Sequence, residues 1–144
     1  MRRGYSFEHQ LDKLIDYINK AGYHAHKNHV KRADDGTYLQ GEPYDYEIFT
    51  DDYKACFDAK ESQQKSWNLS NAKLTQVENL KHCKNAGMDA FFLVYYYPNK
   101  QYIKFDVDFV INCLKEGKKS LKMSDGEVWH FVDDFRNKIE DQLC

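Results

Sequence analysis

Three residues between positions 43 and 60 have the types and the spacing of a hydrolytic site. Asp45 stands two residues after Pro43, and Asp58 and Lys60 lie two residues apart further along. Side chains at positions i and i+2 project from one face of a β-strand, so Asp58 and Lys60 would point the same way. If Asp45 lies on a neighbouring strand, it places a second carboxylate beside them. Such a set could hold a divalent cation.

The chemistry that this set favours is phosphodiester hydrolysis. Asp45, Asp58 and the carbonyl of Ala59 are hard oxygen ligands, which suit Mg²⁺, with Mn²⁺ as a substitute. Glu8 could add a third carboxylate. Two carboxylates about 4 Å apart repel by roughly 4 kcal/mol at an effective dielectric of 20, and a cation turns this repulsion into attraction. The cation would activate water and stabilise the leaving oxygen, while Lys60 would offset charge in the transition state.

A structural explanation of the same residues stays open. Acid-x-Lys is common by chance, and Asp58 and Lys60 could form an exposed pair worth under about 1 kcal/mol on a surface hairpin. Glu8 could be a first-turn acid that favours the helix dipole.

The elements that would position these residues can be read from local patterns. Apolar runs at Tyr46–Thr50 and Ala55–Ala59 flank Asp51-Asp52, which predicts a β-hairpin over 43–60. Helical spacing over Ser6–Lys20, with Ser6 as the expected N-cap, predicts an amphipathic first helix with Glu8 at the margin of its apolar stripe. The apolar positions of this stripe are Phe7, Leu11, Leu14, Ile15 and Ile18.

The rest of the chain predicts a mixed sheet flanked by helices, an α/β fold in one domain over residues 1–144. We expect a strand or extended arm at 23–30, a loop at 61–71 anchored by Trp67 and Leu69, and a helix from Leu74 to Ala86-Gly87. The continuous apolar run Ala90–Tyr97 predicts a central strand, and residues 100–105 its hairpin partner. A helix capped by Asp106 and ending at Gly117, an extended segment at 118–123 and a C-terminal helix with Phe131, Phe135 and Ile139 follow.

Composition points to an ordered, soluble protein. The net charge is −2, with local basic segments at 24–32 and 115–122, so charge alone gives no global sign of nucleic-acid binding. The spacing of His24, His26 and His29 fits no standard zinc pattern, and the four cysteines form no Cys-x-x-Cys pair, which indicates reduced structural thiols. No apolar run is long enough to span a bilayer and the N-terminus lacks a signal-peptide pattern, so we expect a cytoplasmic location.

With these residues in place, the chain resembles the PD-(D/E)xK nuclease superfamily and, within it, the RecU-like Holliday junction resolvases. The likeness is carried by segments whose order and spacing match. They are Tyr44-Asp45-Tyr46, Phe57-Asp58-Ala59-Lys60-Glu61-Ser62, Asn68-Leu69-Ser70 leading into Gln76, Gly87 to Val94, and Gly117-Lys118-Lys119-Ser120-Leu121.

The resemblance implies a restriction-endonuclease-like fold and a homodimeric, Mg²⁺-dependent endonuclease that cuts four-way DNA junctions. Asp45, Asp58 and Glu8 would match the acidic positions, Lys60 the motif lysine, and Gln76 a polar position facing the site. Gln76 could equally be an exposed polar residue of its helix. Candidate DNA contacts are Lys27, Lys31, Arg32, Ser62 and Lys65.

Two departures from the family pattern bear on metal geometry and on substrate choice, respectively. Asp58 stands where RecU-like sequences usually carry Glu, and the segment before Asp45 is short, so Tyr38–Pro43 could form only a reduced stalk. The compact size would suit a phage or prophage version. Two alternatives follow: a nuclease of the same superfamily that acts on linear or other branched DNA, and a non-catalytic DNA-binding module.

Overall fold

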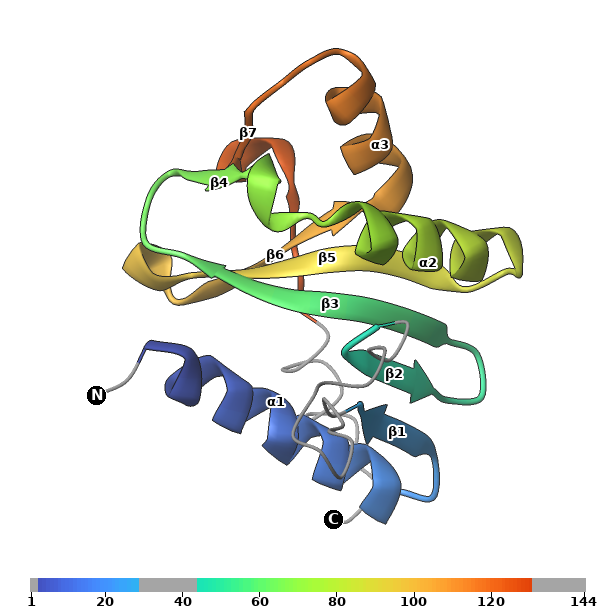
Figure 1. Ribbon diagram of the computed structural model, residues 1–144. Helices are drawn as coiled ribbons and strands as arrows, with labels where there is room; N and C mark the ends of the chain where they lie inside the picture. The colour runs from blue at the N-terminus through green and yellow to red at the C-terminus, as the bar shows by residue number, and fades with distance from the viewer. Residues whose placement is uncertain (1–2, 29–43, 131–144) are drawn as a thin grey trace, which may run out of the picture.

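A six-stranded mixed sheet forms the centre of the molecule, in the order β1-β2-β3-β5-β6-β8 (Figure 1). The structure, a computed structural model, describes residues 3–28 and 44–130. β3 and β5 are parallel, and the other neighbouring strands of this sheet are antiparallel. The strands are β1 (His24–Lys27), β2 (Tyr46–Phe49), β3 (Lys54–Ser62), β5 (Asp89–Tyr96), β6 (Gln101–Asp106) and β8 (Glu127–Val128).

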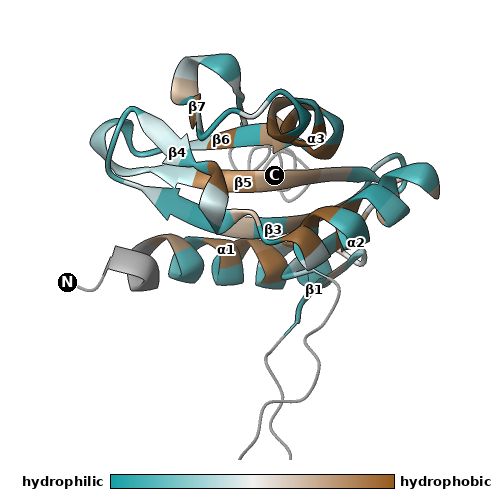
Figure 2. Cartoon of the chain, turned by 45° about the horizontal axis from the view of Figure 1, so that its top comes forward, coloured by the Kyte–Doolittle hydropathy of each residue, from teal (hydrophilic) through white to brown (hydrophobic). Residues whose placement is uncertain are grey.

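β5 is the central strand, as its apolar run predicts. Every residue from Ala90 to Tyr96 is buried, and Figure 2 shows the strand as hydrophobic along most of its length. It pairs with β3 on one side and with β6 on the other. A strand covered on both faces needs apolar side chains on both, which explains a continuous run rather than alternation.

Helices cover the two faces of the sheet. α1 (Arg3–Lys20) packs its apolar stripe on one face, against the side chains of Phe57, Phe91 and Leu93. α2 (Leu74–Asn85) and α3 (Val107–Lys115) lie on the other face (Figure 1). There they enclose a second apolar cluster with Cys56, Phe92 and Val94.

A second, two-stranded antiparallel sheet stands beside the main one. It consists of β4 (Ser66–Asn68) and β7 (Ser120–Lys122). Trp67 and Leu121 are each 1% exposed and point into the cluster beneath α2 and α3. Three short 3₁₀ turns complete the described part: η1 (Leu69–Asn71), η2 (Tyr97–Asn99) and η3 (Met123–Asp125).

The structure confirms most of the expected elements and corrects two. The 43–60 hairpin is present, with Tyr46 opposite Phe57. The first helix begins at Arg3 rather than after a cap at Ser6, because the apolar stripe marks where a helix packs and not where it starts. The expected loop over 61–71 is partly wrong: β3 continues to Ser62 and residues 66–68 form β4.

Three expectations fall on residues outside the described part of the chain. They are the reduced stalk at Tyr38–Pro43, the candidate DNA contacts Lys31 and Arg32, and the C-terminal helix with Phe131, Phe135 and Ile139. Among the described helices, none is long and apolar enough to cross a membrane.

Candidate active site

The two acids of the hairpin lie where the pairing of β2 with β3 ends, with Asp45 just before the first residue of β2. The last pair of the β2–β3 ladder is Tyr46 opposite Phe57, so Asp45 comes opposite Asp58. The Asp45 N–H donates to Asp58 Oδ1 at 3.0 Å, and the Ala59 N–H donates to Asp45 Oδ2, also at 3.0 Å. Each carboxylate therefore accepts a backbone N–H from the opposite side of the hairpin, and these two bonds hold the side chains together.

Asp58 is the buried member of this pair. Its side chain is 1% exposed, and its second oxygen, Oδ2, is buried without a hydrogen-bond partner. Burial, and then the neighbouring charge of Asp45, raise the pKa of Asp58 to about 7. A buried oxygen without a partner beside a second carboxylate is an arrangement that a divalent cation stabilises. The donor set thus fits Mg²⁺ or Mn²⁺.

Lys60 lies on the same face of β3 as Asp58, towards α2. Its ammonium group donates to Gln76 Oε1 at 3.0 Å. The same amide oxygen accepts the Lys73 N–H at 3.3 Å, at the beginning of α2. Gln76 therefore faces Lys60. Its amide oxygen links the Lys60 ammonium group to the N-terminus of α2.

Glu8 lies apart from the two aspartates. It is exposed on α1, and α1 packs on the face of the sheet opposite to the one that Asp58 and Lys60 face. Within residues 3–28 and 44–130, no three His, Cys, Asp or Glu side chains come close enough to hold a metal ion. Glu8 does share a cavity of about 520 Å³ with Lys60, which we call the Lys60 cavity. Glu8 therefore borders the space next to Lys60 without completing a carboxylate cluster with Asp45 and Asp58.

Sequence reasoning missed several residues that line the Lys60 cavity. Ser70, Asn71 and Lys73 enter it from η1 and the start of α2. The signal that could have located them is the Asn68 side chain, whose Oδ1 accepts the Ser70 N–H at 2.9 Å as an N-cap. That cap marks a structured turn in the segment expected to be a loop.

The candidate DNA contacts in the described part occupy different environments. Lys27 forms an ion pair with Asp12 at 3.7 Å and lies over the ring of Tyr46. The Ser62 hydroxyl donates to the Ser66 carbonyl at 2.8 Å and accepts the Gln64 N–H, so it shapes the turn between β3 and β4. Lys65 is exposed at the end of that turn.

The fold is similar to that of a solved enzyme. The structure described as Archaeoglobus fulgidus Hjc, a Holliday junction resolvase from an archaeal hyperthermophile, matches with a TM-score of 0.55 at 18% sequence identity, over 91% of this chain and 95% of that chain. This likeness confirms the predicted restriction-endonuclease-like sheet with flanking helices. No curated protein sequence matches significantly. The model of the RecU family, Recombination protein U, matches residues 2–129. This match covers the hairpin acids, the lysine and both sheets, and the chain belongs to the Recombination protein U family.

Proposed function

We propose that this protein is a metal-dependent endonuclease that resolves four-way (Holliday) DNA junctions, acting as a homodimer in which each subunit cuts one strand. Membership of the Recombination protein U family and the fold shared with a junction resolvase support the substrate class. The observation that carries the chemistry is the unpartnered, buried Oδ2 of Asp58 beside Asp45. A surface hairpin with an exposed acid–lysine pair would not bury that oxygen.

The residues of the site have separate roles in this proposal. Asp45 and Asp58 would hold Mg²⁺, with the Ala59 carbonyl as a further oxygen ligand and Glu8 at the outer edge of the cavity. The cation supplies polarisation of a phosphoryl oxygen and a more acidic water. Lys60 contacts the scissile phosphate or the attacking water and offsets negative charge that develops there. Gln76 keeps the Lys60 ammonium group on the side of Asp58.

Cleavage of matched DNA substrates tests this proposal. A four-way junction and a linear duplex of the same sequence are incubated with the protein, with and without Mg²⁺. We expect paired cuts in the junction, dependence on the metal, and a loss of at least about 100-fold in Asp58→Asn. Asp16→Asn, an exposed acid on α1, is the matched control and should keep full activity.

The other outcomes separate the alternatives. Equal cutting of the linear duplex would overturn the junction preference and leave a nuclease for linear or other branched DNA. Binding of DNA without any metal-dependent cutting would indicate a non-catalytic DNA-binding module. Junction cleavage that persists in Asp58→Asn would overturn the assignment of the site.

A further inference from the structure

The Lys60 cavity adjoins a second cavity along the chain that follows Lys60. The second cavity, of about 510 Å³, shares Glu61, Trp67 and Asn71 with the first. The rest of its lining is neutral and polar apart from Tyr97, and it includes Gln63, Gln64, Asn68 and Ser120. The two adjoining cavities form a mostly polar groove that leads from Lys60 onto the small sheet.

The outer wall of this groove is the face of the small sheet that points to solvent, which we call the β4–β7 ribbon face. Ser66 pairs with Lys122 and Asn68 pairs with Ser120 in the antiparallel register. Because neighbouring side chains in a strand alternate, Trp67 and Leu121 point inward and these four point outward. The Asn68 side-chain carbonyl oxygen caps η1, and Asn68 also lines the second cavity.

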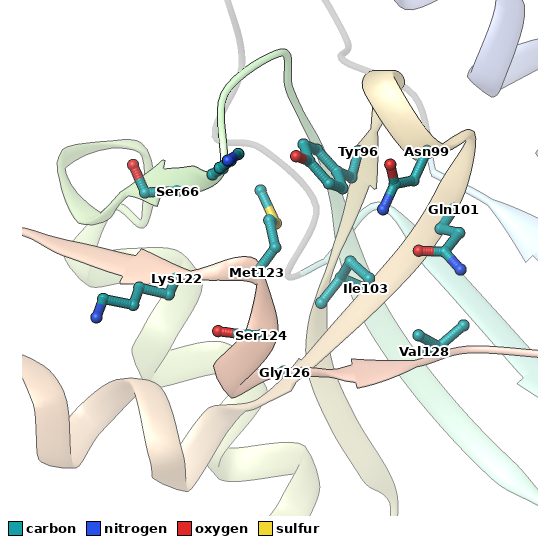
Figure 3. A pocket seen from close by; sticks show the side chains of 11 residues that line it. Ser66, Tyr96, Asn99, Gln101, Ile103, Lys122, Met123, Ser124, Gly126 and Val128 are labelled. Atoms are coloured by element: carbon teal, nitrogen blue, oxygen red, sulfur yellow. The ribbon is translucent and has the colours of Figure 1, made fainter.

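Two exposed lysines stand at the far end of the small sheet: Lys122 on the ribbon face, and Lys65 in the turn immediately before β4. A third cavity, of about 680 Å³, shares Ser66 with the groove and adds Lys65 and Lys122. Figure 3 shows Ser66 and Lys122 on one side of it, with Asn99 and Gln101 on the other. The Lys65 carbonyl accepts the Met123 N–H at 2.9 Å, which extends the pairing of β4 with β7 and keeps the two lysines on adjacent strands.

The charge of the ribbon face differs from that of the rest of the molecule. Neither β4 nor β7 contains an acidic residue, whereas the whole chain has a net charge of −2. Glu61 lines both the first and the second cavity, and its carboxylate accepts the Tyr97 hydroxyl at 2.9 Å. Across the described ranges, Lys65 and Lys122 form no ion pair. Lysines without a carboxylate partner, beside neutral polar side chains, match the sugar–phosphate backbone, which offers one negative charge per nucleotide.

We propose that the β4–β7 ribbon face holds the duplex arm next to the scissile phosphate, with Lys65 and Lys122 contacting backbone phosphates. This inference rests on the proposed function, because the groove begins at the lysine of the proposed nuclease site. The occupant is the DNA backbone, since lysine ammonium groups contact phosphates and such contacts carry no base-sequence information. The basic segment at 115–122, which is far from Lys60 in the sequence, thereby contributes Lys122 to the DNA contact.

The salt dependence of junction binding tests this proposal. Binding of a four-way junction is measured by fluorescence anisotropy without divalent metal, at increasing NaCl, for the wild type and for Lys65→Gln/Lys122→Gln. Each phosphate contact contributes about 0.9 to the slope of log affinity against log salt, so the variant should lose about 1.8 in slope and bind roughly tenfold more weakly. In cleavage assays its KM should rise while kcat at saturating junction is unchanged.

Matched variants separate a local contact from a general charge effect. Lys20→Gln/Lys54→Gln removes the same charge from two exposed lysines at the far ends of α1 and β3, and it should keep the wild-type slope. Lys65→Arg/Lys122→Arg should bind as the wild type does. Thermal unfolding of each variant checks that these exposed substitutions leave the fold intact.

The outcomes also separate this proposal from the one on which it rests. If the wild type cuts junctions and Lys65→Gln/Lys122→Gln keeps its affinity and slope, only the ribbon-face proposal is overturned. Equal losses in the ribbon variant and the Lys20/Lys54 control would overturn it as well, since the effect would then be net charge. A wild type that neither binds nor cuts junctions overturns the proposed function itself.

Discussion

The carboxyl group of Asp58 is harder to ionise in this fold than in water. Its Oδ2 has no hydrogen-bond partner, and the ionised form faces both low polarity and the neighbouring Asp45. The backbone N–H of Asp45 offsets only part of this. A group whose protonated form is favoured by folding destabilises the protein once it is ionised. The residue that carries the proposed chemistry thus lowers the stability of the metal-free protein.

Replacement of Asp58 by Asn should therefore stabilise the metal-free protein at high pH. The pKa is about 7 in the folded protein and about 3.9 when unfolded, so the wild type loses stability as the pH rises from 4 to 7. We expect Asp58→Asn to exceed the wild type by about 2 kcal/mol in unfolding free energy at pH 8, and by much less at pH 5. Urea unfolding in EDTA measures this. An equal effect at both pH values would contradict the account, and Asp16→Asn is the control.

Metal binding should have the complementary pH dependence. A cation at Asp45 and Asp58 competes with the proton on Asp58, so Mg²⁺ should raise the melting temperature of the wild type more at pH 8 than at pH 6. Thermal unfolding with and without Mg²⁺ at the two pH values gives the comparison. In Asp58→Asn the response to Mg²⁺ should be lost. A response that survives in this variant would place the cation elsewhere.

Gln76 should affect the rate of cleavage and not the affinity for DNA. Its amide oxygen holds the Lys60 ammonium group at 3.0 Å. Without it, Lys60 samples more rotamers, and we expect Gln76→Ala to lower kcat roughly tenfold with KM unchanged, as for other groups that orient catalytic side chains. Single-turnover cleavage of a junction measures this. Glu78→Ala, an exposed change on α2, is the control, and a rise in KM alone would show that Gln76 contacts substrate.

At the scale of elements, the site depends on where helices and strands begin and end. β2 is five residues shorter than β3, and this difference leaves the Asp58–Ala59 edge open to the Asp45 side chain. α2 begins at Leu74, which places Gln76 in its first turn beside Lys60. The β4–β7 pairing then closes the other side of the cavity with Trp67. Strand and helix ends, rather than their interiors, build the cavity.

The N-terminus of α3 can be used to test whether a helix end is stabilised by its N-cap hydrogen bond or by an ion pair. Asp106 Oδ2 accepts the Asp108 N–H at 3.0 Å as the N-cap, and Asp106 also pairs with Lys84 of α2 at 2.6 Å. The pair is about one third exposed and so is worth under about 1 kcal/mol. We expect Asp106→Ala to lower the unfolding free energy by about 1–2 kcal/mol and Asp106→Asn, which keeps the cap, by less. Urea unfolding distinguishes them, and equal losses would show that the ion pair dominates.

At the scale of the whole molecule, contacts far apart in sequence join the layers. The Tyr102 hydroxyl of β6 donates to Gln10 Oε1 at 2.9 Å and contacts the Phe7 carbonyl at 3.3 Å, both on α1. Phe7 also stacks on Tyr95 of β5. These contacts hold the first turns of α1, and with them Glu8, against the end of the sheet where the site lies. The position of Glu8 is therefore a property of the assembled fold.

Loss of the Tyr102 hydroxyl should loosen α1. We expect Tyr102→Phe to lower the unfolding free energy by about 1 kcal/mol and to speed amide exchange in α1 more than in β5, because the sheet keeps its own hydrogen bonds. Hydrogen exchange followed by mass spectrometry measures both segments. Tyr17→Phe, at a side chain that is 40% exposed, is the control. If amide exchange became faster by the same factor throughout the chain, the Tyr102 hydroxyl would stabilise the whole fold and not specifically the packing of α1 on the sheet.

The local parts of the site were predictable from the sequence because they depend on short-range periodicity. Alternation places Asp58 and Lys60 on one face of a strand, and the Asp51-Asp52 turn sets Asp45 opposite Asp58. Helical spacing gives α1 and the position of Gln76 near the start of α2. The small sheet was not predictable in this way, since Ser66–Asn68 is too short to show a period and its partner lies more than fifty residues later.

The hairpin, its two acids, its lysine and the central apolar strand can be predicted from residues within a few positions of one another. The buried, unpartnered oxygen of Asp58, the cavity that Glu8 shares with Lys60 and the cavity that Lys122 shares with Lys65 cannot. These depend on how layers pack and which distant strands pair. That choice is made by the burial of side chains such as Trp67 and Leu121 and is not written in any local pattern.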